Sequence, residues 1–243
     1  MLGLPDSIRA CLFDLDGVLT KTATVHFAAW KRTFDEFLHR YDPGQPEFNQ
    51  LDYNRFVDGK HRADGVRGFL ESRGIVLAEG GADDPPDAAT VHAIATRKNE
   101  MVLAELEEHG VEIYPGSVRY LRACKDAGLA TAVVTASANG EKVIAAGGFA
   151  DLIDVRIDGL VAGRDHLRGK PEPDTFVAGA RALGFEPAQA VVYEDAISGV
   201  QAGRAGAFGF VVGVDRVGQA AALKEHGADV VVTDLEELMG EGA

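Results

Sequence analysis

Six short apolar runs rich in valine, isoleucine and alanine recur along this 243-residue chain, and they restrict its fold more than any other feature. Each run ends at a polar residue, and helix-like stretches separate the runs. Continuous apolarity, in contrast to alternation, predicts strands that are covered on both faces, as in a parallel sheet. We therefore predict a doubly wound α/β core. The predicted strands are residues 10–13, 130–134, 152–155, 190–193, 208–212 and 229–232.

Residues 22–110 interrupt this alternation of strands and helices. They contain longer amphipathic stretches, 26–40 and 91–108, and no convincing buried strand. We interpret them as a helical insertion, so that the chain forms a core domain of residues 1–21 and 111–243 and an α-helical cap domain of residues 22–110. An insertion at this point is expected over the carboxyl end of the first strand, where a lid would belong.

The charge and the apolar runs exclude several classes of partner. A formal net charge of −14 repels polyanions, and no dense stripe of lysine and arginine offsets it, so neither nucleic acid nor an anionic membrane is an expected partner. No apolar run reaches the ~20 residues that span a bilayer. The N-terminus lacks the basic start and long apolar stretch of a signal peptide, and we expect a cytoplasmic protein.

Polar residues follow several of the predicted strands. Ligands of open α/β sheets bind outside the carboxyl ends of the strands, so residues at those ends are candidates for function. Four carboxylates, one hydroxyl and one ammonium are expected at this edge, which is the set of groups that phosphoryl transfer requires. They are Asp14 and Asp16 after the first strand, Thr135 after the second, Glu194 and Asp195 after the fourth, and Lys170 in a loop before a helix.

This set of groups predicts magnesium-dependent transfer through an aspartyl-phosphate intermediate. Asp14 is the predicted nucleophile, and Asp16 is the predicted acid and base for the leaving and accepting oxygens. Lys170 would offset charge on the transferring group, and Thr135 would donate a hydrogen bond to one of its oxygens. Hard carboxylate oxygens suit Mg²⁺. The predicted metal-binding residues are Asp14, Asp16, Glu194 and Asp195.

Four segments around these residues resemble the four motifs of the haloacid dehalogenase superfamily. The pair Asp14 and Asp16 in the first motif is similar to that of the phosphotransferase branch, because the dehalogenases lack the second acid. The resemblance covers nearly the whole chain and implies a Rossmann-like core with an inserted α-helical cap. The segments are residues 13–20, 134–137, 169–174 and 193–200.

Within the superfamily the chain most resembles the β-phosphoglucomutase-like subfamily, which carries a helical cap at this place. The resemblance implies that Arg62 holds the distal phosphate of a bisphosphorylated sugar and that His26 helps to close the cap. One position departs from the subfamily: a lysine before the cap glycine is replaced by Asp58, and Lys60 lies on the other side of Gly59. The substrate-binding residues that the resemblance implies are His26, Lys60, Arg62, Ser137 and Asn139.

Two enzymatic functions fit these motifs. One is a β-phosphoglucomutase-like isomerase acting on a hexose phosphate, which Lys60, Arg62 and Asn139 favour. The other is a phosphatase for a small sugar or polyol phosphate, which shares the first half-reaction and then uses water. A non-enzymatic receiver, signalling through a phosphorylated aspartate, has its acidic pair before the phosphorylated residue, the reverse of the order here. The expected partner is a small-molecule phosphate ester, and the expected state is a monomer or weak homodimer.

Overall fold

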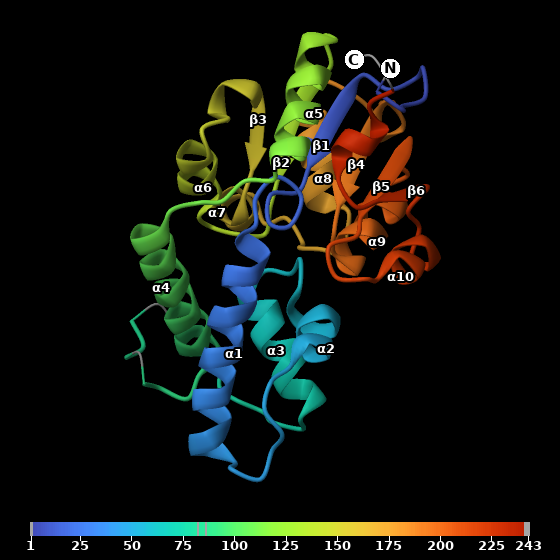
Figure 1. Cartoon of the computed structure of the whole chain (residues 1–243). Helices are drawn as coiled ribbons and strands as arrows, with labels where there is room; N and C mark the ends of the chain where they lie inside the picture. The colour runs from blue at the N-terminus through green and yellow to red at the C-terminus, as the bar shows by residue number, and fades with distance from the viewer. Residues whose placement is uncertain (1, 82, 86, 241–243) are drawn as a thin grey trace. The chain divides into compact units, whose positions relative to one another are not determined.

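The computed structural model describes residues 2–81, 83–85 and 87–240, and the chain divides into two compact units (Figure 1). Met1–Lys21 and Val111–Ala243 form the first unit, and Thr22–Gly110 forms the second. The chain therefore leaves the first unit after one strand and returns to it before helix α5 (Pro115–Asp126).

The first unit is built on a sheet of six parallel strands in the order β3-β2-β1-β4-β5-β6. Strand β1 lies in the middle, and the chain continues to β2 on one side and later to β4 on the other. This order confirms the predicted doubly wound sheet. The strands are β1 (Ala10–Phe13), β2 (Ala130–Val134), β3 (Val155–Ile157), β4 (Ala190–Glu194), β5 (Phe210–Val214) and β6 (Val230–Val232).

Helices cover the sheet on both faces. Every residue of β1 and of β4 is buried, and successive strand residues point to opposite faces, so neither face of these strands is open to solvent. This burial is the physical reason for the continuous apolar runs. The helices that follow α5 are α6 (Gly140–Gly147), α7 (Gly159–Arg164), α8 (Asp174–Ala182), α9 (Ile197–Ala205) and α10 (Ala220–Glu225).

The prediction for the third strand was wrong in position, because residues 152–155 contribute only Val155 to β3. Leu152 ends a 3-10 turn, and its carbonyl oxygen accepts a hydrogen bond from the Thr131 hydroxyl (2.6 Å). The Asp154 carboxylate accepts from the backbone N–H of Thr131 (2.9 Å). Leu152 is therefore buried as part of a turn and not as part of a strand. The later strands begin within two residues of their predicted starts.

The second unit is helical, as the long amphipathic stretches predicted. Its core is aromatic: the rings of Trp30 and Phe34 are stacked with centroids 4.9 Å apart, and Phe34 and Phe69 lie 4.2 Å apart. No helix in the described part of the chain is long and apolar enough to cross a membrane. The elements are α1 (Thr22–Tyr41), α2 (Gln50–Asp52), a π-helical turn (Tyr53–Val57), α3 (Arg62–Ser72) and α4 (Val91–His109).

The segments that leave and re-enter the first unit are hydrogen-bonded to each other. Lys21 N–H donates to the carbonyl oxygen of Glu112 (2.8 Å), and Tyr114 N–H donates to that of Leu19 (2.9 Å). The Lys21 ammonium also lies 2.9 Å from the Glu112 carboxylate. The segment that leaves the first unit and the segment that returns to it are therefore paired by two backbone hydrogen bonds within that unit.

Candidate active site

Two of the predicted acids lie next to each other at the carboxyl edge of the sheet. Strands β1 and β4 are parallel and pair Phe13 with Tyr193, so the residues that follow, Asp14 and Glu194, are neighbours. The N–H of Asp14 continues the ladder by donating to the carbonyl oxygen of Tyr193 (2.9 Å). Both carboxylates are buried, Glu194 completely. Two buried acids side by side can both stay ionised only beside a cation.

Lys170 supplies a cation between these two acids. Its ammonium donates to Asp14 Oδ1 and lies 2.5 Å from Glu194 Oε1, although it comes from the loop before α8. The ammonium also lies 5.0 Å from the ring centroid of Phe176, a cation–π distance. Burial alone would lower the pKa of Lys170, but the charges of Asp14 and Glu194 raise it above its usual value. Lys170 is therefore a fixed positive charge.

Asp14 has a strongly perturbed environment. Burial raises the pKa of its carboxyl group, Lys170 acts in the opposite direction, and the charges of Glu194 and Asp16 raise the pKa further. Burial and the neighbouring acids thus disfavour the ionised form of Asp14, even beside Lys170. A second cation at this edge would favour the ionised form that a nucleophile needs.

Thr135 and Asp16 are joined by a hydrogen bond. The Thr135 hydroxyl donates to Asp16 Oδ2 (3.1 Å) and accepts from the N–H of Ser137 (3.0 Å). Asp16 is half-buried, whereas Thr135 is buried. Ser137 and Asn139 are also buried, and the Ser137 hydroxyl accepts from the N–H of Asn139 (3.2 Å). The segment that follows β2 is therefore hydrogen-bonded to the loop after β1 through Thr135 and Asp16.

The surroundings of Glu194 and Asp195 fit a metal ion, since both carboxylates rest against glycines. A Cβ atom on Gly17 would lie 1.8 Å from Asp195 Oδ2, and one on Gly199 would lie 1.9 Å from Glu194 Oε1. Any larger residue would displace these oxygens, which are the hard ligands that Mg²⁺ prefers. Among residues 2–81, 83–85 and 87–240, however, no three acidic, histidine or cysteine side chains converge as they stand to hold a metal.

The second unit contains a buried lysine that the sequence analysis missed. The Lys98 ammonium lies 2.6 Å from His26 Nδ1 and 5.1 Å from the ring centroid of Trp30. Because an ammonium can only donate, Nδ1 accepts, and a neutral His26 carries its proton on Nε2. A signal was present: Lys98 continues the buried stripe of α4 that includes Ile94 and Val102. A lysine inside such a stripe is exceptional.

Two cationic side chains, with a histidine between them, lie where α3 begins. Lys60, His61 and Arg62 are each half-buried, and burial lowers the pKa of each of them. The Lys60 ammonium donates to the carbonyl oxygen of Arg55 (3.3 Å). Gly59 has a φ of +70°, which lets the chain turn between Asp58 and Lys60. Partly desolvated cations in a turn suit an anionic ligand.

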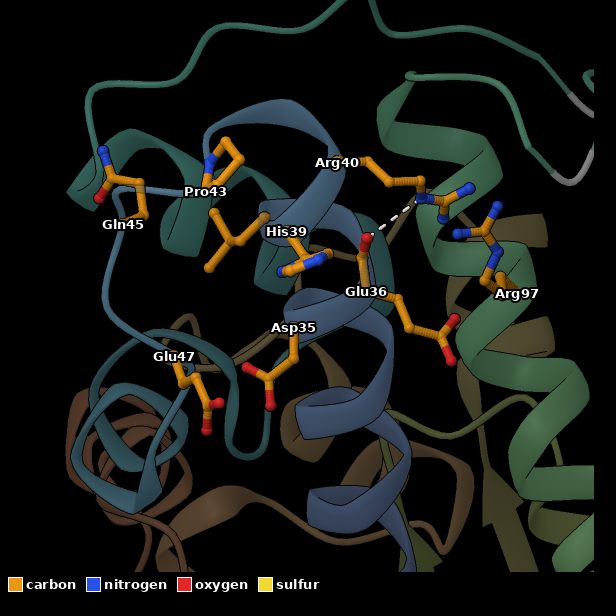
Figure 2. Close-up of a pocket in the computed structure, with 9 residues that line it drawn as sticks. Asp35, Glu36, His39, Arg40, Pro43, Gln45, Glu47 and Arg97 are labelled. Carbon is orange, nitrogen blue, oxygen red and sulfur yellow. Dashed lines mark hydrogen bonds between the residues drawn. The ribbon is translucent and has the colours of Figure 1, made fainter.

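The cavity in Figure 2 also lies in the second unit, but it is not this candidate site. Its volume is about 730 Å³, and its lining includes Asp35, Glu36 and Arg40. Asp35 Oδ1 accepts from the N–H of Phe48 (2.8 Å), and Arg40 Nε donates to the carbonyl oxygen of Glu36 (3.1 Å). None of the residues predicted to bind substrate or metal lines it.

Acids at strand ends, a buried lysine and an inserted helical unit together define a phosphoryl-transfer enzyme of the α/β class. A family model of the haloacid dehalogenase-like hydrolases matches residues 8–206. The chain belongs to this family.

Similar proteins include both mutases and a phosphatase. A β-phosphoglucomutase of Mycobacterium tuberculosis is 49% identical over 98% of this chain and 94% of its own length. Hexitol phosphatase A of Escherichia coli is 28% identical over 95% of this chain and 93% of its own. A crystal structure of a β-phosphoglucomutase from Clostridium difficile has a TM-score of 0.77 and 25% identity, and the match covers 96% of this chain and 94% of that one.

Proposed function

We propose that this protein is a magnesium-dependent phosphotransferase that interconverts the phosphates of a hexose, in the manner of a β-phosphoglucomutase. The observation that carries the proposal is the contact of the buried Lys170 with Asp14 and Glu194, where Asp14 lies two residues before Asp16 in the first motif. The 49% identity to the mycobacterial mutase over nearly the whole chain supports the choice of reaction.

The residues of the first unit can be assigned to the steps of the transfer. A carboxylate oxygen of Asp14 attacks phosphorus, the bond from phosphorus to the sugar oxygen breaks, and the leaving oxygen takes a proton from Asp16. In the return step Asp16 takes a proton from the accepting hydroxyl, which attacks the phosphorus and releases Asp14. Lys170 orients Asp14 and offsets negative charge, because its ammonium is already bound to that carboxylate.

Mg²⁺ is the proposed cofactor. A bound Mg²⁺ would neutralise negative charge near the phosphoryl oxygens. The residues that would hold it are Asp14, Asp16, Glu194 and Asp195, and the glycines against Glu194 and Asp195 support this assignment.

Product analysis tests the proposed reaction. The purified protein is incubated with Mg²⁺, β-glucose 1-phosphate and a trace of glucose 1,6-bisphosphate, and both glucose 6-phosphate and free phosphate are followed. We expect isomerisation without stoichiometric phosphate release, because a mutase returns its phosphoryl group to a sugar and not to water. Phosphate release without isomerisation would contradict the mutase.

A sugar or polyol phosphatase is the second candidate, favoured by Asp58 at the position where the resemblance implies a lysine. The similarity to hexitol phosphatase A also supports it. Lys60 could replace the missing charge, since it lies two residues from Asp58 and is half-buried. The phosphatase would share the Asp14 half-reaction and differ only in the acceptor. The product analysis above separates the two candidates.

Arg62→Ala is expected to reduce mutase turnover by at least tenfold while changing hydrolysis of p-nitrophenyl phosphate much less. We assign to Arg62 the phosphate that is not being transferred, which a bisphosphate intermediate always presents and a small monoester lacks. A charged hydrogen bond is worth about 1.5–3 kcal/mol, or roughly ten- to a hundredfold in binding. The measurement is kcat/KM for both reactions.

Arg67→Ala is the matched control for this experiment. Arg67 lies on the same helix but pairs with Glu79 and Asp64 at the surface, so its loss should change neither activity. Arg62→Lys should recover part of the mutase turnover, since an ammonium keeps the charge and loses the planar fork. Equal losses of both activities in a folded Arg62→Ala protein would contradict the assigned role, and so would no loss at all.

A further inference from the structure

Arg216, which lies two residues after β5, binds the loop of the first motif. Its Nε donates to the carbonyl oxygen of Gly17 (2.8 Å), and one terminal nitrogen lies 3.3 Å from that of Val18 and 3.2 Å from the Ser117 hydroxyl. The other terminal nitrogen donates to the carbonyl oxygen of Thr233 (2.5 Å). Only 13% of the Arg216 side chain is exposed. These contacts come from three separate stretches of the chain.

Gly17 is held from three directions as a result. Its N–H donates to the carbonyl oxygen of Thr20 (2.7 Å), and its own carbonyl oxygen accepts from Arg216. Its Cα faces Asp195, so closely that no Cβ would fit. Its φ of +91° belongs to the region that favours glycine. The peptide that follows Asp16 therefore cannot shift while these contacts persist.

Arg216 also stacks on the segment that returns from the second unit. Its guanidinium carbon lies 3.5 Å from the ring centroid of Tyr114, which is a close stacking contact. Tyr114 N–H donates to the carbonyl oxygen of Leu19, in the same loop as Gly17. The guanidinium thus contacts both the loop of the first motif and Tyr114 of the returning segment, all within the first unit. Its planar shape and five donors allow contacts that a lysine could not make together.

We propose that Arg216 is a positioning residue for Asp16, holding the Gly17 and Val18 carbonyls so that the Asp16 carboxyl reaches the leaving oxygen. The inference rests on the proposed function, in which Asp16 gives that oxygen a proton. The Thr135 hydroxyl orients the carboxyl from one side, at 3.1 Å. Arg216 holds the backbone that follows Asp16.

Leaving groups that differ in their need for a proton provide the test. Phosphoryl transfer to the protein is measured in a single turnover from glucose 1,6-bisphosphate, whose leaving alkoxide needs protonation, and from p-nitrophenyl phosphate, whose phenolate does not. We expect Arg216→Met to slow transfer from the bisphosphate at least about tenfold, because general acid catalysis depends on placement. Transfer from the aryl ester should fall by less than about threefold by the same argument.

Arg204→Met is the matched control. Arg204 also donates to a backbone carbonyl oxygen, that of Gly227, and to a carboxylate, that of Asp229, but at the amino end of β6. It should leave transfer from both donors unchanged. Arg216→Lys should give an intermediate loss with the bisphosphate, and it replaces Arg216→Met in the test if the methionine variant does not fold.

The outcomes separate this inference from the proposed function. A wild-type protein that accepts a phosphoryl group from neither donor contradicts the proposed function. A wild-type protein that accepts from both, with Arg216 variants that are unimpaired or equally slow with both donors, contradicts the positioning role alone. Equal slowing is what a general loss of packing would produce.

Discussion

Asp14→Asn is expected to abolish phosphoryl transfer from every monoester and to leave the chain folded. An amide is a very poor nucleophile, and the loss of a covalent nucleophile costs roughly 10⁴-fold or more in kcat. Water cannot solvate the charge of the buried Lys170 ammonium. Its contact with Glu194 nevertheless remains when Asp14 is replaced by a neutral asparagine. The fold should therefore persist. The measurement is kcat, together with intact mass after acid quenching.

Wild type should gain the mass of one phosphoryl group in that quench, and Asp14→Asn should not. Asp229→Asn is the control for the same chemical change, since Asp229 lies at the amino end of β6 and binds Arg204 and the N–H of Val211. It should retain both phosphorylation and turnover. If a folded Asp14→Asn protein were still phosphorylated, the nucleophile would be a residue other than Asp14.

Removal of Mg²⁺ is expected to lower turnover by at least about a hundredfold, because the acids at the sheet edge would otherwise repel an anionic substrate. Burial and the charges of Glu194 and Asp16 already raise the pKa of Asp14, so Lys170 alone does not neutralise this edge. Activity is measured after dialysis against a chelator and again after Mg²⁺ is restored. Ca²⁺ should restore it poorly, since it takes longer bonds and more ligands.

Asp195→Asn tests the proposed metal site without removing metal from the wild-type protein. We expect the half-saturating Mg²⁺ concentration to rise at least about tenfold, as for other losses at a metal site. Binding can be followed without substrate through the rise in melting temperature that Mg²⁺ produces, because a ligand of the folded state stabilises it. Full activity in excess chelator would show that the reaction does not need a metal ion.

The parallel sheet was predictable because its signal is local. A strand buried on both faces is apolar along nearly its whole length, as Ala10–Phe13 and Ala190–Tyr193 are, so these residues were recognised without any knowledge of their partners. The same signal failed at 152–155, where Leu152 is apolar but belongs to a turn. Burial and strand pairing are different properties, and an apolar run reports only burial.

The helical insertion was predictable for a similar reason, since α1 and α4 are long amphipathic helices. Lys98 was missed because its neighbour His26 lies on the other helix, 72 residues earlier in the chain. Its place in a buried stripe was visible, but the group that explains its burial was not. Arg216 was missed because the partners that give it a role lie in segments about 100 to 200 residues away in the chain.

The sequence alone predicted which chemical groups stand at the carboxyl edge of the sheet, because the residues that follow each apolar run are a local property of the chain. Only the tertiary structure decided how these groups meet. It placed the Lys170 ammonium against Asp14 and Glu194, joined Thr135 to Asp16, and bound Arg216 to the loop after Asp16. Distances between residues far apart in the chain follow from packing the helices on the sheet, which no single segment encodes.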